Sequence, residues 1–488
     1  MALFTLCLVF LQCLVAITGY PKDFNGKTNF VVLLMDDMGW GDLGVYGEPN
    51  RETPNMDQMA AEGVLLPDFY SANPLCSPSR ASLLSGRLPI RNGFYTTNMR
   101  GRNAYTPQDI MGGIPDYEIL LPEILKEHGY RSKIIGKWHL GQQPQYLPHN
   151  HGFDEFFGAP NCHFGPYNNK NTPNVPVYKD ANMEGIEFIE AQTQKSEPFF
   201  LYWAADATHG PMYASKPFLG KSARGLYGDA VIELDYGVGQ ILSTLKRLGI
   251  AEQTLVFFSS DNGAATYAKL EGGSNGPFLC GKETTFEGGM REPTIAWWPG
   301  NIPPGKVRFT DLGWEYFVMV LHHFMEHPNH EKRYCINFNA CVFVHRPIFY
   351  YRGDLLMAVR VGNYKAHLWT WANSLEEFQK GTDFCPGQNV QNMTVRQQED
   401  HSQQPLLFNL AKDYGEKYQI KPNSAEYKSV IPKITAAVKE HLDHLKKGEP
   451  QLNYCDDAVM NWAPPGCKEI GQCLPIPPSN KQLCYWPH

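Results

Sequence analysis

Apolar runs of strand length alternate with helical patterns along the first two thirds of the chain. Helices are indicated where Thr53 and Pro54 can begin a helix that Gly63 ends, at residues 122–128, and where apolar residues recur at helical spacing between residues 226 and 245. The runs predicted as strands are residues 30–35, 130–135, 199–203 and 255–258. This alternation predicts an α/β domain with a large, mainly parallel or mixed sheet flanked by helices.

The pattern changes after about residue 345. Short strands separated by turn signals are predicted at residues 347–351, 356–361 and 364–371, and residues 424–445 have the spacing of an amphipathic helix. These elements predict a smaller α+β domain with an antiparallel sheet. The predicted division is a leader at 1–19, a main domain at 20–345, an antiparallel-sheet domain at 346–447 and a cysteine-rich tail at 448–488.

Polar residues follow each of the four strands predicted in the main domain. Because ligands bind beyond the carboxyl ends of strands in open α/β sheets, we expect these residues to converge on one edge. Each residue alone fits a helix cap, a turn or a solvated surface charge, whereas four such groups together indicate a functional site. In chain order they are Asp36 and Asp37, Lys137 and His139, Thr208 and His209, and Asp261 and Asn262.

The chain begins with an apolar stretch at residues 2–17. This stretch is shorter than the roughly 20 residues that a helix needs to span a bilayer, and polar sequence follows at once. We therefore predict a secretory signal peptide cleaved near residues 16–20, with a buried N-terminal strand as the alternative. No later stretch is apolar enough to predict a membrane span, so the mature chain is expected in a lumen of the secretory pathway.

The cysteines favour an oxidising compartment. Four of the 12 cysteines crowd into the proline-rich tail, where little apolar surface can be buried and disulfides are expected: Cys455, Cys467, Cys473 and Cys484. The sequence Asn392-Met393-Thr394 is an N-glycosylation signal and predicts a surface loop.

Composition and charge narrow the class of protein. The aromatic content of 13% excludes a disordered chain. The chain has 43 basic and 50 acidic residues, and it lacks the run of Lys and Arg that would indicate a nucleic-acid-binding groove. Protonation of its 16 histidines in an acidic compartment would move the net charge from −7 toward positive values, which favours a polyanionic substrate.

The sharpest chemical signal is the run Cys-Ser-Pro-Ser-Arg at residues 76–80. The proline shapes a turn into a helix, and a helix N-terminus favours anions and lowers a thiol pKa. An ordinary cysteine in a turn or a disulfide is the alternative. The full pattern resembles the signature of the sulfatase family, in which this cysteine is oxidised to formylglycine before folding.

Further motifs resemble the sulfatase family in the same order along the chain. The resemblance covers residues 29–306 and resumes from Arg346 to the end. The matching motifs are MDDMGWGD from Met35, TPNMDQMAAEGV from Thr53, GKWHLG from Gly136, THGP from Thr208, SDNG from Ser260 and GKETTFEGGMREP from Gly281.

The resemblance implies an alkaline phosphatase-like fold and a role for each matching residue. A divalent cation, Ca²⁺ with Mg²⁺ as the alternative, would be held together with the modified Cys76 by Asp36, Asp37, Asp261 and Asn262. Sulfate would be bound by Arg80, Lys137 and Lys282, protons would be transferred by His139 and His209, and the substrate pocket would be lined by Tyr105. The implied disulfides are Cys280–Cys385, Cys455–Cys484 and Cys467–Cys473. Because the three acids and the three bases cancel, the cation would leave the site with the positive charge that a sulfate ester needs.

The resemblance also implies a function. It is that of an exosulfatase of the lysosome lumen that removes 6-sulfate from N-acetylgalactosamine or galactose in glycosaminoglycans such as chondroitin 6-sulfate and keratan sulfate. Modification by the formylglycine-generating enzyme and a homodimer are implied as well. The alternatives are a catalytically inactive, glycan-binding homologue and a phosphoryl transferase of the same superfamily, which would need Ser or Thr at position 76.

Two segments depart from the family pattern. The segment at residues 179–197 is shorter than the corresponding segment of the family, as if a helix-bearing insert were missing. Residues 308–345 lack the expected helix and Asp-Gly turn and contain the unexpected Cys335 and Cys341. Our hypothesis is that the second segment is spliced differently or mispredicted, and sequencing the transcript across codons 300–350 would test it.

Overall fold

The computed structural model describes residues 24, 26–98, 109–162, 178–308, 312–313, 346–371, 379–386, 398–460 and 478–484. Several predictions concern residues outside these ranges: the leader at 1–19, Tyr105, Asn392, the pair Cys467–Cys473, and most of the atypical segment at 308–345. Among the described residues, none of the helices is both long and apolar enough to cross a bilayer.

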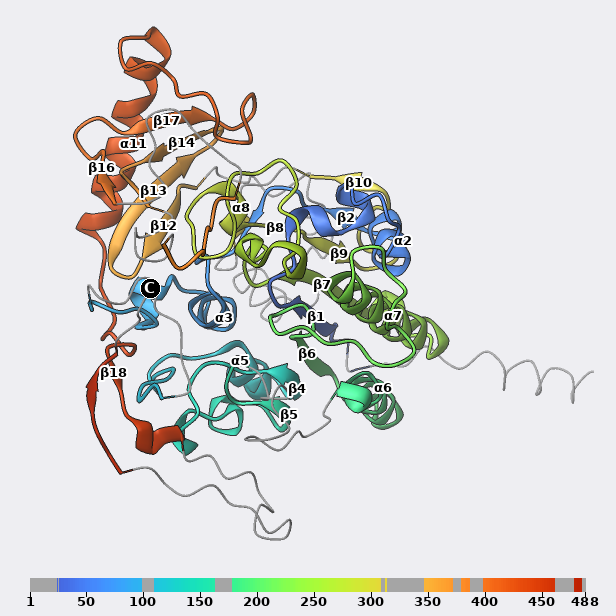
Figure 1. Cartoon of the computed structure of the whole chain (residues 1–488). Helices are drawn as coiled ribbons and strands as arrows, with labels where there is room; N and C mark the ends of the chain where they lie inside the picture. Colours follow the sequence, from blue (N-terminus) through green and yellow to red (C-terminus); the bar gives the residue numbers. More distant parts are fainter. Residues whose placement is uncertain are drawn as a thin grey trace, which may run out of the picture.

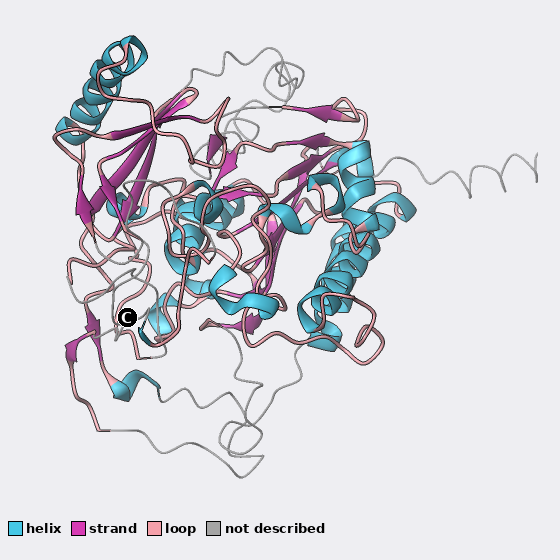
Figure 2. Cartoon of the chain, turned by 45° about the horizontal axis from the view of Figure 1, so that its top comes forward, coloured by secondary structure: helices cyan, strands magenta, loops and turns pink. Residues whose placement is uncertain are grey.

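An eight-stranded mixed sheet lies at the centre of the first region (Figures 1 and 2). Its five strands from β7 to β5 run parallel, and β9 pairs antiparallel with β7. Across the sheet the order is β10 (Lys306–Val307), β2 (Val64–Leu65), β9 (Ile295–Trp297), β7 (Thr254–Ser260), β1 (Asn29–Met35), β6 (Phe199–Ala205), β4 (Arg131–Lys137) and β5 (Glu155–Ala159). The predicted fold class is confirmed.

Helices cover both faces of this sheet, because the side chains of each strand alternate between two apolar cores. In β1, Val31 and Leu33 face one core while Val32 and Leu34 face the other. The first core is closed by α2 (Pro54–Glu62), α6 (Tyr178–Lys195) and α7 (Leu226–Arg247), and the second by α3 (Cys76–Ser85) and α5 (Leu121–Glu127).

A four-stranded antiparallel sheet forms the second region, seen at the upper left of Figure 1. Helix α11 (Ala425–Asp443) covers one of its faces, and the Ser424 side chain caps that helix by accepting a hydrogen bond from the Tyr427 amide. Tyr350 and Ala358 on the opposite face pack against Tyr70 and Met290 of the first region. The strand order is β12 (Ile348–Arg352), β13 (Leu355–Val361), β14 (Tyr364–His367) and β17 (Leu406–Asn409).

The remaining short strands form three small sheets. Cys455 and Cys484 form a disulfide at the β18–β19 pair, as the family resemblance implies. The short strands are β3 (Phe69–Tyr70), β8 (Arg291–Glu292) and β11 (Leu312–Gly313) in one sheet, β15 (Trp369–Thr370) with β16 (Glu399–Asp400), and β18 (Tyr454–Cys455) with β19 (Gln482–Leu483).

The elements of the first region that the sequence pattern does not predict include β5 and α6. β5 lies at the edge of the sheet, and four of its five residues are only partly buried, so its pattern is mixed. Helix α6 forms from the segment that is shorter than the family pattern. A Cβ atom added to Gly185 would lie 3.5 Å from Ile135 and 3.6 Å from Leu201, which places this helix directly on β4 and β6. The shortened segment therefore still supplies a helix that covers the sheet.

A buried charge cluster joins the two regions. We call it the junction cluster, and it consists of Glu287, Arg291, Lys365, His367 and Glu416. Lys365 Nζ lies 2.9 Å from Glu287 Oε1 and 3.1 Å from Glu416 Oε1. Burial would raise the pKa of Glu287, but Lys365 and Arg291 outweigh it and lower that pKa to about 2. Since Glu416 also accepts a hydrogen bond from the Glu287 amide at the start of α8 (Glu287–Met290), the cluster fixes both regions to this helix.

His441 is a second buried titratable group, on the inner side of α11. Its Nε2 lies 2.8 Å from the Tyr351 hydroxyl, and its ring stacks on Phe349 with 3.7 Å between ring centroids. Burial, with a smaller repulsion from Arg91, lowers the pKa of His441 to about 4.

We therefore expect His441 to make the fold less stable in acid. The unfolded chain protonates this histidine near its ordinary pKa of about 6.5, whereas the folded chain resists protonation until about pH 4, so stability is lost as pH falls through that window. The expected loss is about 1–3 kcal/mol. Urea unfolding at pH 7 and pH 4.5 should show a smaller acid loss for His441→Gln than for the wild type. An unchanged acid loss in His441→Gln would contradict the prediction, and exposed His444→Gln is the matched control.

Candidate active site

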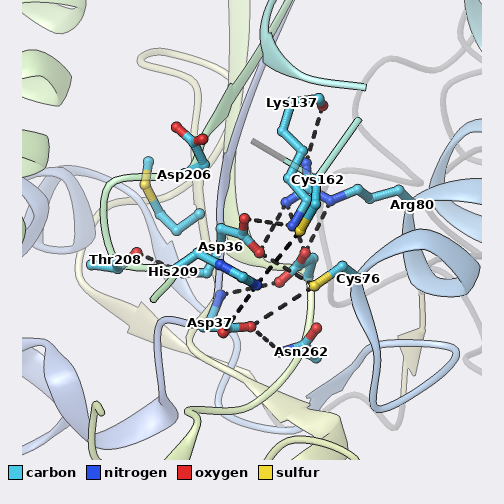
Figure 3. Close-up of polar contacts among 12 residues, drawn as sticks. Asp36, Asp37, Cys76, Arg80, Lys137, Cys162, Asp206, Thr208, His209 and Asn262 are labelled. Atoms are coloured by element: carbon cyan, nitrogen blue, oxygen red, sulfur yellow. Dashed lines mark hydrogen bonds and ion pairs between the residues drawn. The ribbon is translucent and has the colours of Figure 1, made fainter. Parts of the chain in front are cut away.

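Nine side chains converge beyond the carboxyl ends of β1, β4, β6 and β7, as the order of the sequence motifs predicts (Figure 3). The ends of these neighbouring strands are level, because Met35 pairs with Ala205 on one side and with Ser260 on the other. We call this group the active-site cluster. It consists of Asp36, Asp37, Cys76, Arg80, Lys137, His209, Asp261, Asn262 and Lys282.

Cys76 is the first residue of α3, so its thiol sits at a helix N-terminus. Its Sγ lies 3.5 Å from Asp36 Oδ1 and 4.0 Å from Asp37 Oδ1. Burial raises the pKa of the Cys76 thiol well above its usual range, although Lys137 and Lys282 act in the opposite direction. The unmodified thiol is therefore protonated at neutral pH and is a poor nucleophile.

Three buried cations pair with three buried carboxylates. Lys137 Nζ lies 2.6 Å from Asp36 Oδ2. Burial would raise the pKa of Asp36, but Lys137 is the largest of several positive groups that hold it well below its usual range. The Asp36 carboxylate is therefore fully ionised at neutral pH.

The other two ion pairs involve Arg80 and Lys282. Lys282 Nζ lies 2.6 Å from Asp37 Oδ2, and Arg80 donates from Nε and Nη2 to Asp261 Oδ2 at 3.0 and 2.7 Å. For Asp261, burial and the nearby Asp36 charge outweigh Arg80 and raise the pKa to about 6. At neutral pH, the charges of the three cations therefore balance those of the three carboxylates.

The donor atoms next to Cys76 suit a hard divalent cation. One ligand atom from each of Asp36, Asp37, Cys76 and His209 lies within 4.8 Å of the others. Asn262 donates through Nδ2 to Asp37 Oδ1 at 2.8 Å, and its own Oδ1 is buried and accepts no hydrogen bond from the residues that the structure describes. Carboxylate and amide oxygens are the ligands that Ca²⁺ and Mg²⁺ prefer, so these residues fit such an ion.

Asp261 has a different environment from the other predicted ligands. Its Oδ1 accepts a hydrogen bond from the Asp37 amide at 3.2 Å, while its Oδ2 is occupied by Arg80. It is also absent from the group of ligand atoms within 4.8 Å of one another, which instead includes His209. Its role as a metal ligand stays a prediction.

The two histidines named from the sequence lie in different surroundings. His209 is 15% exposed in its side chain, and its Nε2 lies 3.8 Å from Asp37 Oδ2 and 3.7 Å from Cys162 Sγ. Its Nδ1 lies 2.8 Å from the carbonyl oxygen of Gly210. His139 is buried two residues beyond the end of β4. His209 is therefore the better placed of the two to meet an incoming substrate.

Backbone strain accompanies the polar residues after β1 and β4. Asp37 and His139 have φ angles of 58° and 60°, in the left-handed region that residues other than glycine rarely adopt. Gly136 has a φ angle of 101°, and a Cβ atom there would lie 2.0 Å from the carbonyl oxygen of Ala204. Such strain is typical of functional sites, where the surrounding structure holds side chains in position.

Comparison with known proteins decides the family. The sulfatase family model matches residues 28–327, and the model described as the C-terminal region of aryl-sulfatase matches residues 344–475. The chain belongs to the sulfatase family. It is an enzyme that hydrolyses sulfate esters, and the alternative of an inactive binding protein is set aside.

The relatives of this sulfatase cover nearly its whole length. It is 58% identical over 493 residues to an N-acetylgalactosamine-6-sulfatase of Canis lupus familiaris and 56% identical over 495 residues to that of Homo sapiens, with 94% of each chain covered in both cases. Arylsulfatase A of Bos taurus is 34% identical, covering 92% of this chain and 95% of the relative. A crystal structure of a Pseudoalteromonas sp. sulfatase matches with a TM-score of 0.69 and 26% identity, covering 90% of this chain and 95% of that one.

Cys162 is the residue of this sulfatase's site that the sequence interpretation missed. It follows β5, and its partly buried thiol reaches the active-site cluster at His209 (Figure 3). Burial would raise the pKa of Cys162, but Lys137 and His209 outweigh it and lower that pKa. A prediction of β5 as a fifth strand would have placed Cys162 at the same sheet edge.

The disulfide Cys280–Cys385 holds the loop that carries Lys282. It joins residues 105 positions apart, and so it fixes this loop of the first region to a loop of the second region. Asn275 donates a hydrogen bond to the Cys280 carbonyl at 2.9 Å, and the Lys282 amide donates to the Ala264 carbonyl at 3.0 Å. The position of the Lys282 backbone is therefore fixed both by the disulfide and by these hydrogen bonds.

Proposed function

We propose that this sulfatase removes the 6-sulfate from N-acetylgalactosamine or galactose residues of glycosaminoglycans, with formylglycine made from Cys76 as its nucleophile. The substrate is supported by relatives of 56–58% identity that are named N-acetylgalactosamine-6-sulfatases. The observation that carries the chemistry is the position of Cys76. This residue begins α3, and its Sγ lies 3.5 Å from the Asp36 carboxylate.

Residues around position 76 would bind a cation and provide the nucleophile. A divalent cation, for which we propose Ca²⁺, would be held by Asp36, Asp37 and Asn262, with Asp261 beside them, and would supply positive charge opposite the sulfate oxygens. The hydrated aldehyde of formylglycine would supply one hydroxyl that attacks sulfur and a second whose deprotonation expels sulfate. The residues of this chain bind the sulfate and move the protons.

Arg80, Lys137 and Lys282 are proposed to orient the sulfate. Their charges are already buried and held in place by Asp261, Asp36 and Asp37, so binding requires little rearrangement. His209 would protonate the departing sugar oxygen as general acid, because its side chain is partly exposed whereas that of His139 is buried. We assign to His139 the acceptance of the second hydroxyl's proton, and to Tyr105 a place in the substrate pocket.

The proposed substrate is tested by comparing two galactosides that carry the sulfate at different positions. The purified full-length protein should release sulfate from a 4-methylumbelliferyl galactoside 6-sulfate with a kcat/KM at least about tenfold above that for the 4-sulfate, since a misplaced reacting group costs binding and orientation. Equal or reversed preference would overturn the proposed substrate. Mass spectrometry of the tryptic peptide that contains residue 76 checks the modification, because the aldehyde is lighter than the thiol.

The cellular setting is proposed from the sequence and the relatives. The apolar leader and the clustered cysteines favour delivery through the secretory pathway, and we propose the lysosome lumen as the site of action. The formylglycine-generating enzyme is the partner that the modification of Cys76 requires. A homodimer, the implied N-glycan at Asn392 and the pair Cys467–Cys473 stay predictions.

Removal of divalent cations is expected to lower both the activity and the thermal midpoint. A cation that binds the folded chain at a hundredfold excess over its Kd stabilises it by about 2.7 kcal/mol, so EGTA should lower the midpoint and added Ca²⁺ should restore it. Asn262→Ala should need at least about tenfold more Ca²⁺ for the same midpoint. A midpoint insensitive to both reagents would argue against the site, and exposed Asn50→Ala serves as the control.

A further inference from the structure

Residues 264–267 form a segment directly after Gly263 that belongs to none of the sequence motifs. It packs on the loop that carries Lys282, since the Lys282 amide donates to the Ala264 carbonyl at 3.0 Å. A Cβ atom on Gly281 would lie 2.9 Å from Thr266 Oγ1, so the two chain segments are in close contact. The segment is therefore placed beside the active-site cluster by the same loop that places Lys282.

The second region holds the other side of this segment. The Thr266 hydroxyl donates to the Phe384 carbonyl at 3.4 Å, and the Tyr267 ring meets the Phe384 ring edge to face with 4.7 Å between centroids. Phe384 is itself buried, and its neighbour Cys385 is bonded to Cys280. The Tyr267 ring is thus held in one orientation by a packed aromatic contact and a disulfide-linked loop.

The Tyr267 hydroxyl has hydrogen-bonding capacity that the described residues leave unused. The residue is only partly buried, and its hydroxyl makes no hydrogen bond to any residue within the described part of the chain. The groups that act electrostatically on it include three members of the active-site cluster, Lys282, Asp37 and Cys76, together with Glu283. Burial raises the pKa of Tyr267, so the phenol stays neutral and can donate or accept a hydrogen bond.

We propose that Tyr267 is a specificity-determining residue whose hydroxyl hydrogen-bonds a hydroxyl or amide substituent of the sugar that carries the sulfate. The inference rests on the proposed function, because it requires a sulfated sugar at the active-site cluster. The cations of that cluster recognise the sulfate and carry no information about the sugar. Tyr267 adds a neutral, directional group next to them, and a site built to hydrogen-bond a substrate substituent discriminates against analogues that lack it.

Tyr267→Phe tests the proposal, because it removes only the hydroxyl and keeps the ring contact with Phe384. With nitrophenyl galactoside 6-sulfate, kcat/KM should fall about tenfold, mainly through KM. With nitrophenyl sulfate, which has no sugar, it should stay within about twofold of the wild type. Tyr236→Phe, at an exposed tyrosine of α7, is the matched control and should change neither value.

The other outcomes are separable. An equal fall with both substrates means that Tyr267 supports the structure of the site and overturns the proposed sugar contact. No change with either substrate overturns it as well. If the wild type cleaves nitrophenyl sulfate but not the galactoside 6-sulfate, the proposed function fails and the sugar contact fails with it, whereas an active wild type with an unaffected variant removes the sugar contact alone.

Discussion

Replacement of Cys76 by serine is expected to abolish multiple turnovers. A serine hydroxyl can attack sulfur once, but it has no second hydroxyl whose deprotonation expels the sulfate, so the chain would stop as a stable sulfate ester. We expect steady-state activity to fall at least about a thousandfold, as for removal of other catalytic nucleophiles. Mass spectrometry of the variant after incubation with substrate should show the mass of one sulfate on the peptide that contains residue 76.

Cys76→Ala is the control that separates chemistry from structure. Alanine has no hydroxyl, so this variant should be inactive and should carry no sulfate adduct. Both variants should keep the wild-type fold, because Cys76 makes no disulfide and its thiol lies at the start of α3 with only long contacts to two carboxylates. Steady multiple turnovers by purified Cys76→Ser would refute the formylglycine mechanism.

Among the variants described, replacement of Lys365 by methionine is expected to lower the free energy of unfolding most. Lys365 Nζ is fully buried and contacts Glu287, Glu416 and the carbonyl oxygen of Thr285 at 2.9, 3.1 and 2.8 Å. Methionine fills much of the same volume but leaves two buried carboxylates without their main counter-ion. Removal of one partner from a buried ion pair costs about 3–5 kcal/mol, which should appear as a lower urea midpoint.

Two further variants make the Lys365 prediction specific. Lys439→Met removes a lysine that is 73% exposed and pairs with Asp443, so it should change the unfolding free energy by less than about 0.5 kcal/mol. Adding Glu416→Gln to Lys365→Met removes one of the uncompensated charges and should recover part of the loss. If Lys365→Met is as stable as Lys439→Met, the junction cluster does not hold the two regions together.

The central strands of the large sheet and the polar residues that follow them could be predicted because their signals are local. Residues 30–35 are apolar at every position, which is typical of a strand buried on both faces, and Gly63 ends α2 where predicted. A polar residue next to the end of such a strand must lie at the sheet edge, so Asp36 and Asp261 could be placed together although 225 positions separate them. The run at residues 76–80 added the proposed nucleophile.

Edge elements and pairings could not be predicted in this way. β5 is only partly buried, and therefore its pattern does not separate it from a loop. Without that strand, Cys162 could not be placed beside His209. Nor does the chain order indicate that Asp261 is engaged by Arg80 while Asp36 and Asp37 face Cys76, since all three are aspartates after strand ends.

The sequence by itself therefore determined the α/β class, the edge at which the site lies and the residue types that we propose for the reaction, because each depends on hydrophobic period or on a contiguous motif. Only the tertiary structure decided which carboxylate meets which cation, that Lys365 lies between Glu287 and Glu416, and that Tyr267 is held by Phe384. These contacts join segments more than 45 positions apart, and their energy depends on the burial and geometry that the folded chain creates.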